Sequence, residues 1–268
     1  MNASDMPKVK ISAEDLVELG AAKRLLENPG FTIKVTNLIG LPIEKGIEML
    51  PANWKGKVQT ATQDALMFCL KGAIKTMGTD ATASYPWWHK AAVVTSGAIG
   101  GFAGLPALVL ELPISTSIMM RSIADIGRSH GEQLVTLEAR LNCLMVFAFG
   151  GTSKADDQIN STYFATRVAL GRAVTEAVEY MAGKTIVEEA APAILRLITM
   201  IATQFNVQVA EKAAAQAVPI LGAAGGAAVN YLFLDHFQDM SNGHFAVRKL
   251  ERKYGAESVR LAYEALPA

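Results

Sequence analysis

Apolar residues recur at intervals of three and four along most of this chain, the spacing that places them on one face of an α-helix. Short runs in which apolar and polar residues alternate between turn signals are nearly absent. The pattern predicts an all-α protein, a compact multi-helix bundle with central Gly/Ala-rich hydrophobic helical hairpins. A length of 268 residues suits one helical domain over 1–268.

Capping and breaking residues predict where several helices begin and end. Ser12 and Thr136 each precede an apolar periodic segment and have the side-chain oxygen that an N-cap requires. Pro192 suits the first turn of a long helix, and Gly78 ends an earlier one. Between residues 31 and 51, Gly and Pro divide the chain into short apolar segments.

Two long segments are unusually apolar. Between Lys90 and Arg121 lie thirty residues with Glu111 as the sole charge, and residues 213–234 carry none. Each exceeds the roughly 20 residues that a membrane span requires. Pro106 and Pro113 interrupt the first run, which favours a hairpin of two shorter helices broken near residues 104–106. A tightly packed interior, in-plane or re-entrant insertion and a true span remain open.

Small residues recur four apart within these segments. The pairs are Gly97 with Gly101, Gly100 with Gly104, and Gly222 with Gly226. This spacing lets a second helix backbone approach closely, both in membranes and in protein cores. We therefore expect these glycines to pack helices or to line a ligand site.

Glu111 heads a mostly polar stripe in an otherwise apolar helix. Steps of three and four place one set of residues on a single face: Glu111, Ser115, Ile118, Ser122, Asp125 and Ser129. A buried carboxylate needs a partner, and the nearby candidates are Lys90, Arg121, Arg128 and His130. Glu111 is interpreted either as an internal ion pair or as a group that lines a ligand cavity or transfers a proton.

Composition narrows the function classes. Twenty-five acidic and 25 basic residues give no net charge, so nucleic acid is not an expected partner. Cys69 and Cys143 lie in apolar surroundings without metal-ligand spacing, which predicts free buried thiols. The first residues lack the apolar core of a secretory signal, so a cytoplasmic protein, peripheral to the inner face of a membrane, is expected.

Cofactor motifs are weak. Asp235, His236, Asp239 and His244 have metal-ligating side chains, but Gly243 is expected to end the helix before His244, and no established metal spacing is present. The glycine-rich run near residue 100 lacks the strand and the Lys-Ser/Thr of a phosphate-binding loop. We predict no cofactor and no metal.

Two further groups suit a membrane surface. Trp87 and Trp88 precede the first apolar run, where aromatic rings meet lipid headgroups in membrane proteins. The basic residues near the C-terminus, which would face anionic lipid, are Arg248, Lys249, Arg252 and Lys253. The alternatives are a loop that covers the core and an ordinary solvated helix face.

The blocks "GGFAGLPALVLELPISTSIMMRSIADIGRSHGE", "EKAAAQAVPILGAAGGAAVNYLFLDHFQDMSNGHFAVRKLERKYG" and "VRLAYE" resemble the EcsC protein family of bacteria. The resemblance is strong over 90–268 and weaker over 1–89. It implies a helical protein with hydrophobic central helices and association with membrane or lipid, and it supplies no catalytic mechanism. The motif positions that it marks as structural or ligand-lining are Glu111, Pro113, Arg121, Pro219, Gly222, Gly226, Asn230, His244, Phe245, Arg248, Leu250, Glu251 and Gly255.

The leading hypothesis is a protein that binds a membrane surface, a lipid or an apolar small molecule, as an accessory of a membrane or transport system. The first alternative is a hydrolase of a hydrophobic substrate that uses Glu111, Asp125 or His244 for proton transfer. The second is an interaction protein that assembles with a membrane protein through its small-residue helix faces. The sequence makes no prediction of homo-oligomeric state.

Overall fold

The computed structural model describes residues 11–27, 30–40, 42–48, 50–76, 105–150, 162–182, 184, 188, 191–217 and 222–267. These residues form ten α-helices, one 3₁₀ turn and no strand, which confirms the all-α prediction. The elements are α1 (Ala13–Glu27), α2 (Phe31–Ile39), α3 (Ile43–Glu48), α4 (Trp54–Thr76), α6 (Leu105–Ser129), α7 (Leu137–Met145), η1 (Val146–Ala148), α8 (Thr162–Met181), α9 (Pro192–Gln216), α10 (Gly222–Tyr254) and α11 (Ala256–Ala265).

Several predicted helix ends are confirmed by their capping contacts. The Ser12 hydroxyl accepts a hydrogen bond from the Asp15 backbone N–H at 3.2 Å, and the Thr136 hydroxyl accepts one from Ala139 N–H at 3.2 Å. Pro192 lies in the first turn of α9, where its missing N–H costs no helical bond.

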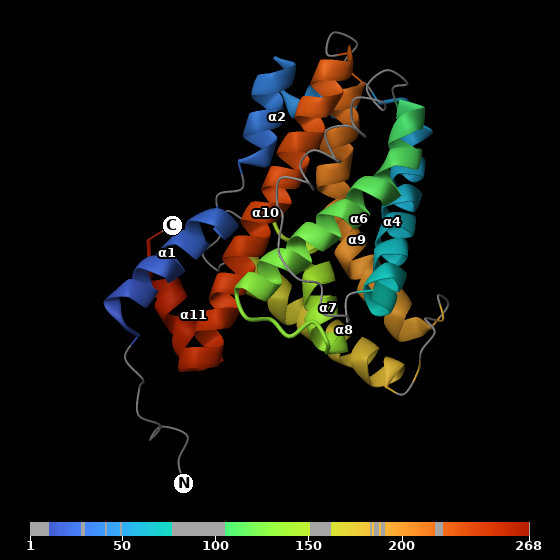
Figure 1. Ribbon diagram of the computed structural model, residues 1–268. Helices are drawn as coiled ribbons and strands as arrows, with labels where there is room; N and C mark the ends of the chain where they lie inside the picture. The colour runs from blue at the N-terminus through green and yellow to red at the C-terminus, as the bar shows by residue number, and fades with distance from the viewer. Residues whose placement is uncertain are drawn as a thin grey trace.

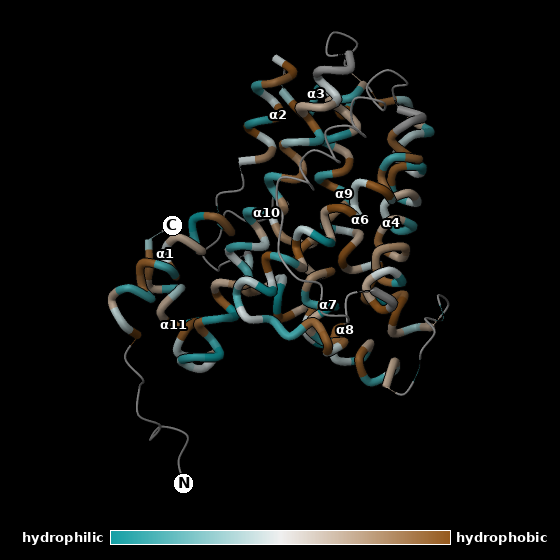
Figure 2. The backbone as a smooth tube through the Cα atoms, in the orientation of Figure 1, coloured by the Kyte–Doolittle hydropathy of each residue, from teal (hydrophilic) through white to brown (hydrophobic). Residues whose placement is uncertain are grey.

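The 33-residue helix α10 organises the fold. Figure 1 shows it running diagonally through the molecule, with α2 beside its first half and α1 and α11 beside its second half. α6 and α9 also pack against α10, while α4 packs against α6 and α9. Apolar and polar residues alternate along each helix in Figure 2, as amphipathic helices around a shared core require.

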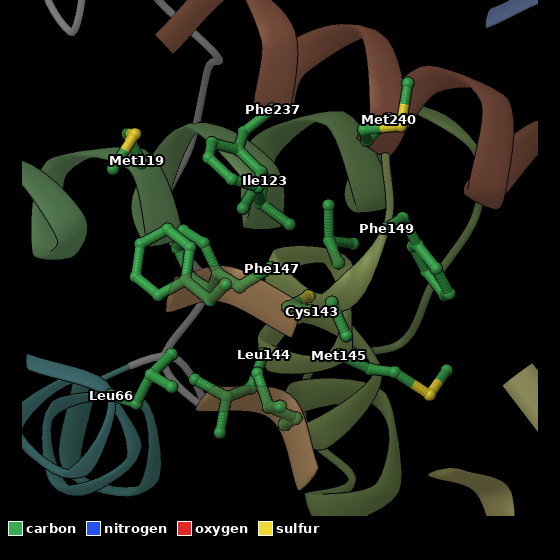
Figure 3. Packing of buried hydrophobic residues seen from close by; sticks show 14 of the residues in the cluster. Leu66, Met119, Ile123, Cys143, Leu144, Met145, Phe147, Phe149, Phe237 and Met240 are labelled. Atoms are coloured by element: carbon green, nitrogen blue, oxygen red, sulfur yellow. The ribbon is translucent and has the colours of Figure 1, made fainter. Parts of the chain in front are cut away.

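An aromatic cluster fills the centre of this arrangement. The Phe147 ring lies 4.9 Å from that of Phe205 and 5.1 Å from that of Phe237, measured between centroids. Figure 3 shows Phe147 and Phe237 beside Ile123 of α6, with Leu66 of α4 on the opposite side. Residues distant in sequence therefore share one core.

Both cysteines are free and buried, as predicted. Burial raises the pKa of Cys69 to about 12 and that of Cys143 further, because a thiolate loses its hydration in the core. These thiols are packing residues rather than nucleophiles.

Two predicted helix breaks are wrong. Pro113 lies inside α6, where the chain stays helical and the Ser117 hydroxyl donates to the Pro113 carbonyl at 2.7 Å. Gly243 lies inside α10, so His244 continues the same helix. A proline removes one backbone bond and a glycine costs about 1 kcal/mol, and tertiary packing outweighs both here.

The two apolar runs are described only in part, and the start of α6 agrees with the break predicted near residues 104–106. α6 begins at Leu105, so Pro106 falls in its first turn, and residues 91–104 lie outside the described residues. The Gly/Ala-rich hairpins are therefore not shown. Residues 213–234 do not form one helix, because α9 ends at Gln216 and α10 begins at Gly222.

Within the described part of the chain, α9 alone has the length and hydropathy of a membrane span. It contacts α3, α4, α8 and α10, and 44% of its most apolar window is buried inside the fold. A central helix of a protein core passes the same test, so this feature is weak evidence for a span.

Gly243 allows α1 to cross α10 closely. A Cβ at this position would lie 2.7 Å from Leu26 Cγ and 3.1 Å from the Ala22 carbonyl oxygen. We expect Gly243→Ala to lower the free energy of unfolding by about 1–3 kcal/mol, because the backbone of α1 must move. Gly171→Ala is the control, since a Cβ there meets no atom within 4 Å. Equal urea midpoints for the two variants would contradict the prediction.

Candidate functional site

Glu111 forms a buried ionic network where α6, α9 and α10 meet. Its carboxylate accepts hydrogen bonds from Lys212 Nζ at 2.8 Å and from Asn230 Nδ2 at 3.0 Å. Lys212 and Asn230 are fully buried, and Glu111 is 7% exposed. Three helices therefore each contribute one polar side chain to a site closed to solvent.

The Lys212 ammonium also interacts with an aromatic ring. Its Nζ lies 4.8 Å from the centroid of the Phe233 ring, within the range of a cation–π interaction. A buried ammonium requires such compensation, because removing it from water costs several kcal/mol. The carboxylate of Glu111 and the ring of Phe233 together provide it.

Three of the four predicted counter-ions of Glu111 are wrong. Arg121 is exposed, Arg128 pairs with Asp125 at 2.7 Å, and His130 Nδ1 contacts the Ile126 carbonyl at 2.9 Å. Lys90 lies outside the described residues. All four candidates are close to Glu111 in sequence, whereas Lys212 is 101 positions away. Lys212 is the last charged residue before the second apolar run, and this position was the sequence feature that could have indicated it as a partner of Glu111.

The polar stripe of α6 faces α10 over much of its length. Beyond the contact of Glu111 with Asn230, the Ser122 hydroxyl accepts a hydrogen bond from Gln238 Nε2 at 2.8 Å. Ser115 is buried and donates to the Leu112 carbonyl of its own helix. The stripe thus joins two helices through matched polar groups, since buried polar groups require partners.

His244 occupies a second, separate cluster. Its Nδ1 lies 2.9 Å from the Tyr163 hydroxyl, and both rings are buried. Burial lowers the pKa of His244 well below its usual value and raises that of Tyr163, so both groups are neutral at pH 7. Beside them Arg167 holds Glu251 with two hydrogen bonds, at 2.7 and 2.6 Å.

The three groups proposed for proton transfer do not meet. Glu111 and Asp125 are fourteen residues apart in one continuous helix, which separates them by about 21 Å along its axis. Asp125 pairs with Arg128, and His244 bonds to Tyr163. Proton transfer between them would require hydrogen-bond reach, so the geometry does not bring a catalytic set together.

The side chains of α10 with metal-ligating chemistry do not form a metal site with one another either. Asp235 pairs with Lys34 of α2 at 3.0 Å, whereas His244 bonds to Tyr163. Among the described residues, no group of three or more His, Cys, Asp or Glu side chains could hold a metal ion. The prediction that no metal is bound applies to the whole chain, including residues outside the described ranges, and it stays a prediction.

The basic residues at the end of α10 are paired with carboxylates. Arg248 and Arg252 both bind Glu132, while Lys249 binds Glu18 at 2.9 Å and Lys253 binds Asp15 at 2.6 Å. These pairs join α10 to α1 and to the loop after α6. Contact of the basic residues with anionic lipid stays a prediction.

Other predicted site residues are placed only in part. Gly222 is the first residue of α10, and Gly226 is buried one turn later, on the same helix face as Asn230. Trp87, Trp88, Gly97, Gly100, Gly101 and Gly104 lie outside the described residues.

The first half of α6 has an exposed apolar face. Leu110 is 77% exposed and Ile114 is 57% exposed, and their spacing of four places them side by side on the helix. The opposite face buries Leu108 and Leu112 completely. This part of α6 is therefore apolar on both its inner and its outer face.

Comparison with known protein families matches residues 15–250 to the EcsC protein family. The match includes the N-terminal third of the chain, where the resemblance was weaker. No curated protein and no solved structure matches the chain.

Proposed function

This chain belongs to the EcsC protein family, and from that premise we propose that it binds the surface of a lipid bilayer through the exposed apolar face of α6. The observation that carries the proposal is the exposure of Leu110 and Ile114, one turn apart on a helix that is apolar on both faces. An exposed apolar face of this kind is typical of a surface that protein or lipid covers.

The buried network supports this role by fixing the helix. Glu111 follows Leu110 directly, and its bonds to Lys212 and Asn230 hold this turn of α6 against α9 and α10. The exposed side chains are therefore carried on a rigid element. A rigid apolar face loses little conformational entropy when it enters a membrane interface.

The size of the face indicates peripheral, reversible binding. Burying a Leu or Ile side chain contributes about 1.5–3 kcal/mol, so two of them supply roughly 3–6 kcal/mol. That is comparable to a weak lipid anchor and far below the effectively irreversible insertion of a spanning helix. Because the basic residues of α10 already have carboxylate partners, we expect binding to depend weakly on salt.

Vesicle flotation tests the proposal. The protein is expected to float with phosphatidylcholine vesicles at both low and high salt, and Leu110→Glu with Ile114→Glu is expected to reduce the floating fraction at least tenfold, since each charge must stay in water. Val168→Glu is the matched control, because Val168 on α8 is 64% exposed. A double variant that floats like the control, with an unchanged circular dichroism spectrum, would exclude this face as the binding surface.

A further inference from the structure

The helices α2 and α3 form a hairpin that packs against α9 and the first half of α10 (Figure 2). The Phe31 ring of α2 lies 5.5 Å from the Phe233 ring, and the backbone of α3 comes so close to α9 that a Cβ on Gly46 would lie 3.2 Å from Ala214 Cβ. On the outer side, Lys34 pairs with Asp235. The hairpin is held by these contacts and by the apolar side chains beneath it.

A carboxyl group without a cation lies under this hairpin. Glu211 of α9 is 4% exposed, and the Thr32 hydroxyl of α2 donates a hydrogen bond to its Oε1 at 2.9 Å. Thr32 is its only polar partner among the described residues. The adjacent residue Lys212 is committed to Glu111. Docking of the hairpin therefore buries one acid to which the described part of the chain supplies no counter-charge.

We propose that the α2–α3 hairpin is a pH-responsive cover, docked on α9 while Glu211 is protonated and released as Glu211 ionises. Release would expose Phe31 and the surface of α9 and α10 around Phe233. The inference rests on Glu211 and its surroundings alone, so it stands or falls independently of lipid binding by α6.

The electrostatics agree with this geometry. The pKa of Glu211 is raised from its usual 4.5 to about 7. Burial is the largest cause; the Thr32 hydrogen bond lowers the pKa, and the nearby charge of Glu44 raises it. An acid with a raised pKa favours the docked state fully below pH 4.5, and this contribution is lost as the pH rises towards 7. The contribution of Glu211 to docking is therefore lost between about pH 4.5 and pH 7.

Other charged groups lie near the same contact. The charged residues that these helices carry near the contact are Lys34 on α2, Glu44, Lys45 and Glu48 on the exposed side of α3, Lys212 on α9, and Asp235, His236 and Asp239 on α10, and of these Glu44 acts on the pKa of Glu211. The pH dependence from His236 has the opposite sign to that from Glu211. Burial lowers the pKa of His236 to about 4, so its protonation disfavours the docked state as the pH falls below 6.5. The effect of Glu211 must therefore be measured as a difference between two proteins.

Hydrogen exchange of the full chain provides that difference. Opening constants for residues 31–39 and 43–48, corrected for intrinsic exchange rates, are compared between wild type and Glu211→Gln from pH 5 to pH 8. Their ratio is expected to rise on the order of 50-fold across this range, because only the wild type acquires a buried charge. Peptides from α11 serve as the internal reference. A ratio that stays constant with pH overturns the proposal.

Two further variants change the size of the pH response in opposite directions and do not require Glu211→Gln to fold. Thr32→Val removes the hydroxyl donor to the carboxyl and raises its pKa in the docked state, so the opening constant is expected to rise more between pH 5 and pH 8 than in wild type. Glu44→Gln removes the neighbouring negative charge and lowers that pKa, so a smaller rise is expected. A rise equal to that of wild type in both variants would assign the pH response to another group.

Discussion

Replacement of Lys212 by methionine is expected to lower the free energy of unfolding by about 3–5 kcal/mol, because Glu111 then remains buried without its cation. Methionine retains most of the volume of the lysine chain, so the loss reports the charge rather than a cavity. Urea unfolding followed by circular dichroism measures it.

The double variant separates charge from packing. Glu111→Gln with Lys212→Met removes both charges, and we expect it to recover most of the stability that Lys212→Met loses, as when a buried ion pair is replaced by neutral groups. Glu111→Gln alone leaves the ammonium buried beside Phe233 and an amide, and should fall between the two. If the losses of the two single variants simply add, Glu111 and Lys212 do not depend on each other energetically.

Replacement of Gly150 by alanine is expected to cost about 3 kcal/mol or more, for two independent reasons. Gly150 has a φ of +76°, a conformation that L-residues with a Cβ rarely adopt. A Cβ there would also lie 2.8 Å from His236 Nε2 and 2.9 Å from Met240 Sδ, both on the buried face of α10. The turn after η1 can therefore contact α10 only because this residue lacks a side chain.

The variant Gly255→Ala separates the effect of backbone strain from that of the steric contact. Gly255 has a φ of +85°, but a Cβ there meets no atom within 4 Å. It should cost about 1 kcal/mol from backbone strain alone. If both variants shift the urea midpoint equally, the contact of Gly150 with His236 and Met240 contributes nothing to stability.

Two adjacent residues of α9 belong to different contacts, Lys212 to the ionic network and Glu211 to the hairpin contact. Glu211 and Lys212 follow one another on α9, yet Lys212 faces α6 and α10 while Glu211 faces α2. One charge is paired inside the core, and the other is left with a single hydroxyl. We therefore expect substitutions of Lys212 to destabilise the fold at all pH values, and those of Glu211 to change how hairpin docking depends on pH.

Local features of the sequence determined much of the architecture. The spacing of apolar residues was sufficient for the fold class, and Ser12, Thr136 and Pro192 marked helix starts correctly because a cap or an N-terminal proline acts within one turn of chain. The same spacing placed Glu111 and Ser122 on one face of α6, which meets α10. Family membership was also recognisable from the sequence.

Tertiary structure decided the features that depend on contacts between distant segments. Local rules predicted breaks at Pro113 and Gly243, but packing against neighbouring helices keeps α6 and α10 continuous. Lys212 became the partner of Glu111, and no cation among the described residues pairs with Glu211, because folding sets which side chains meet. Periodicity shows that a helix has an apolar face, whereas only the assembled bundle shows which face remains exposed, as at Leu110 and Ile114.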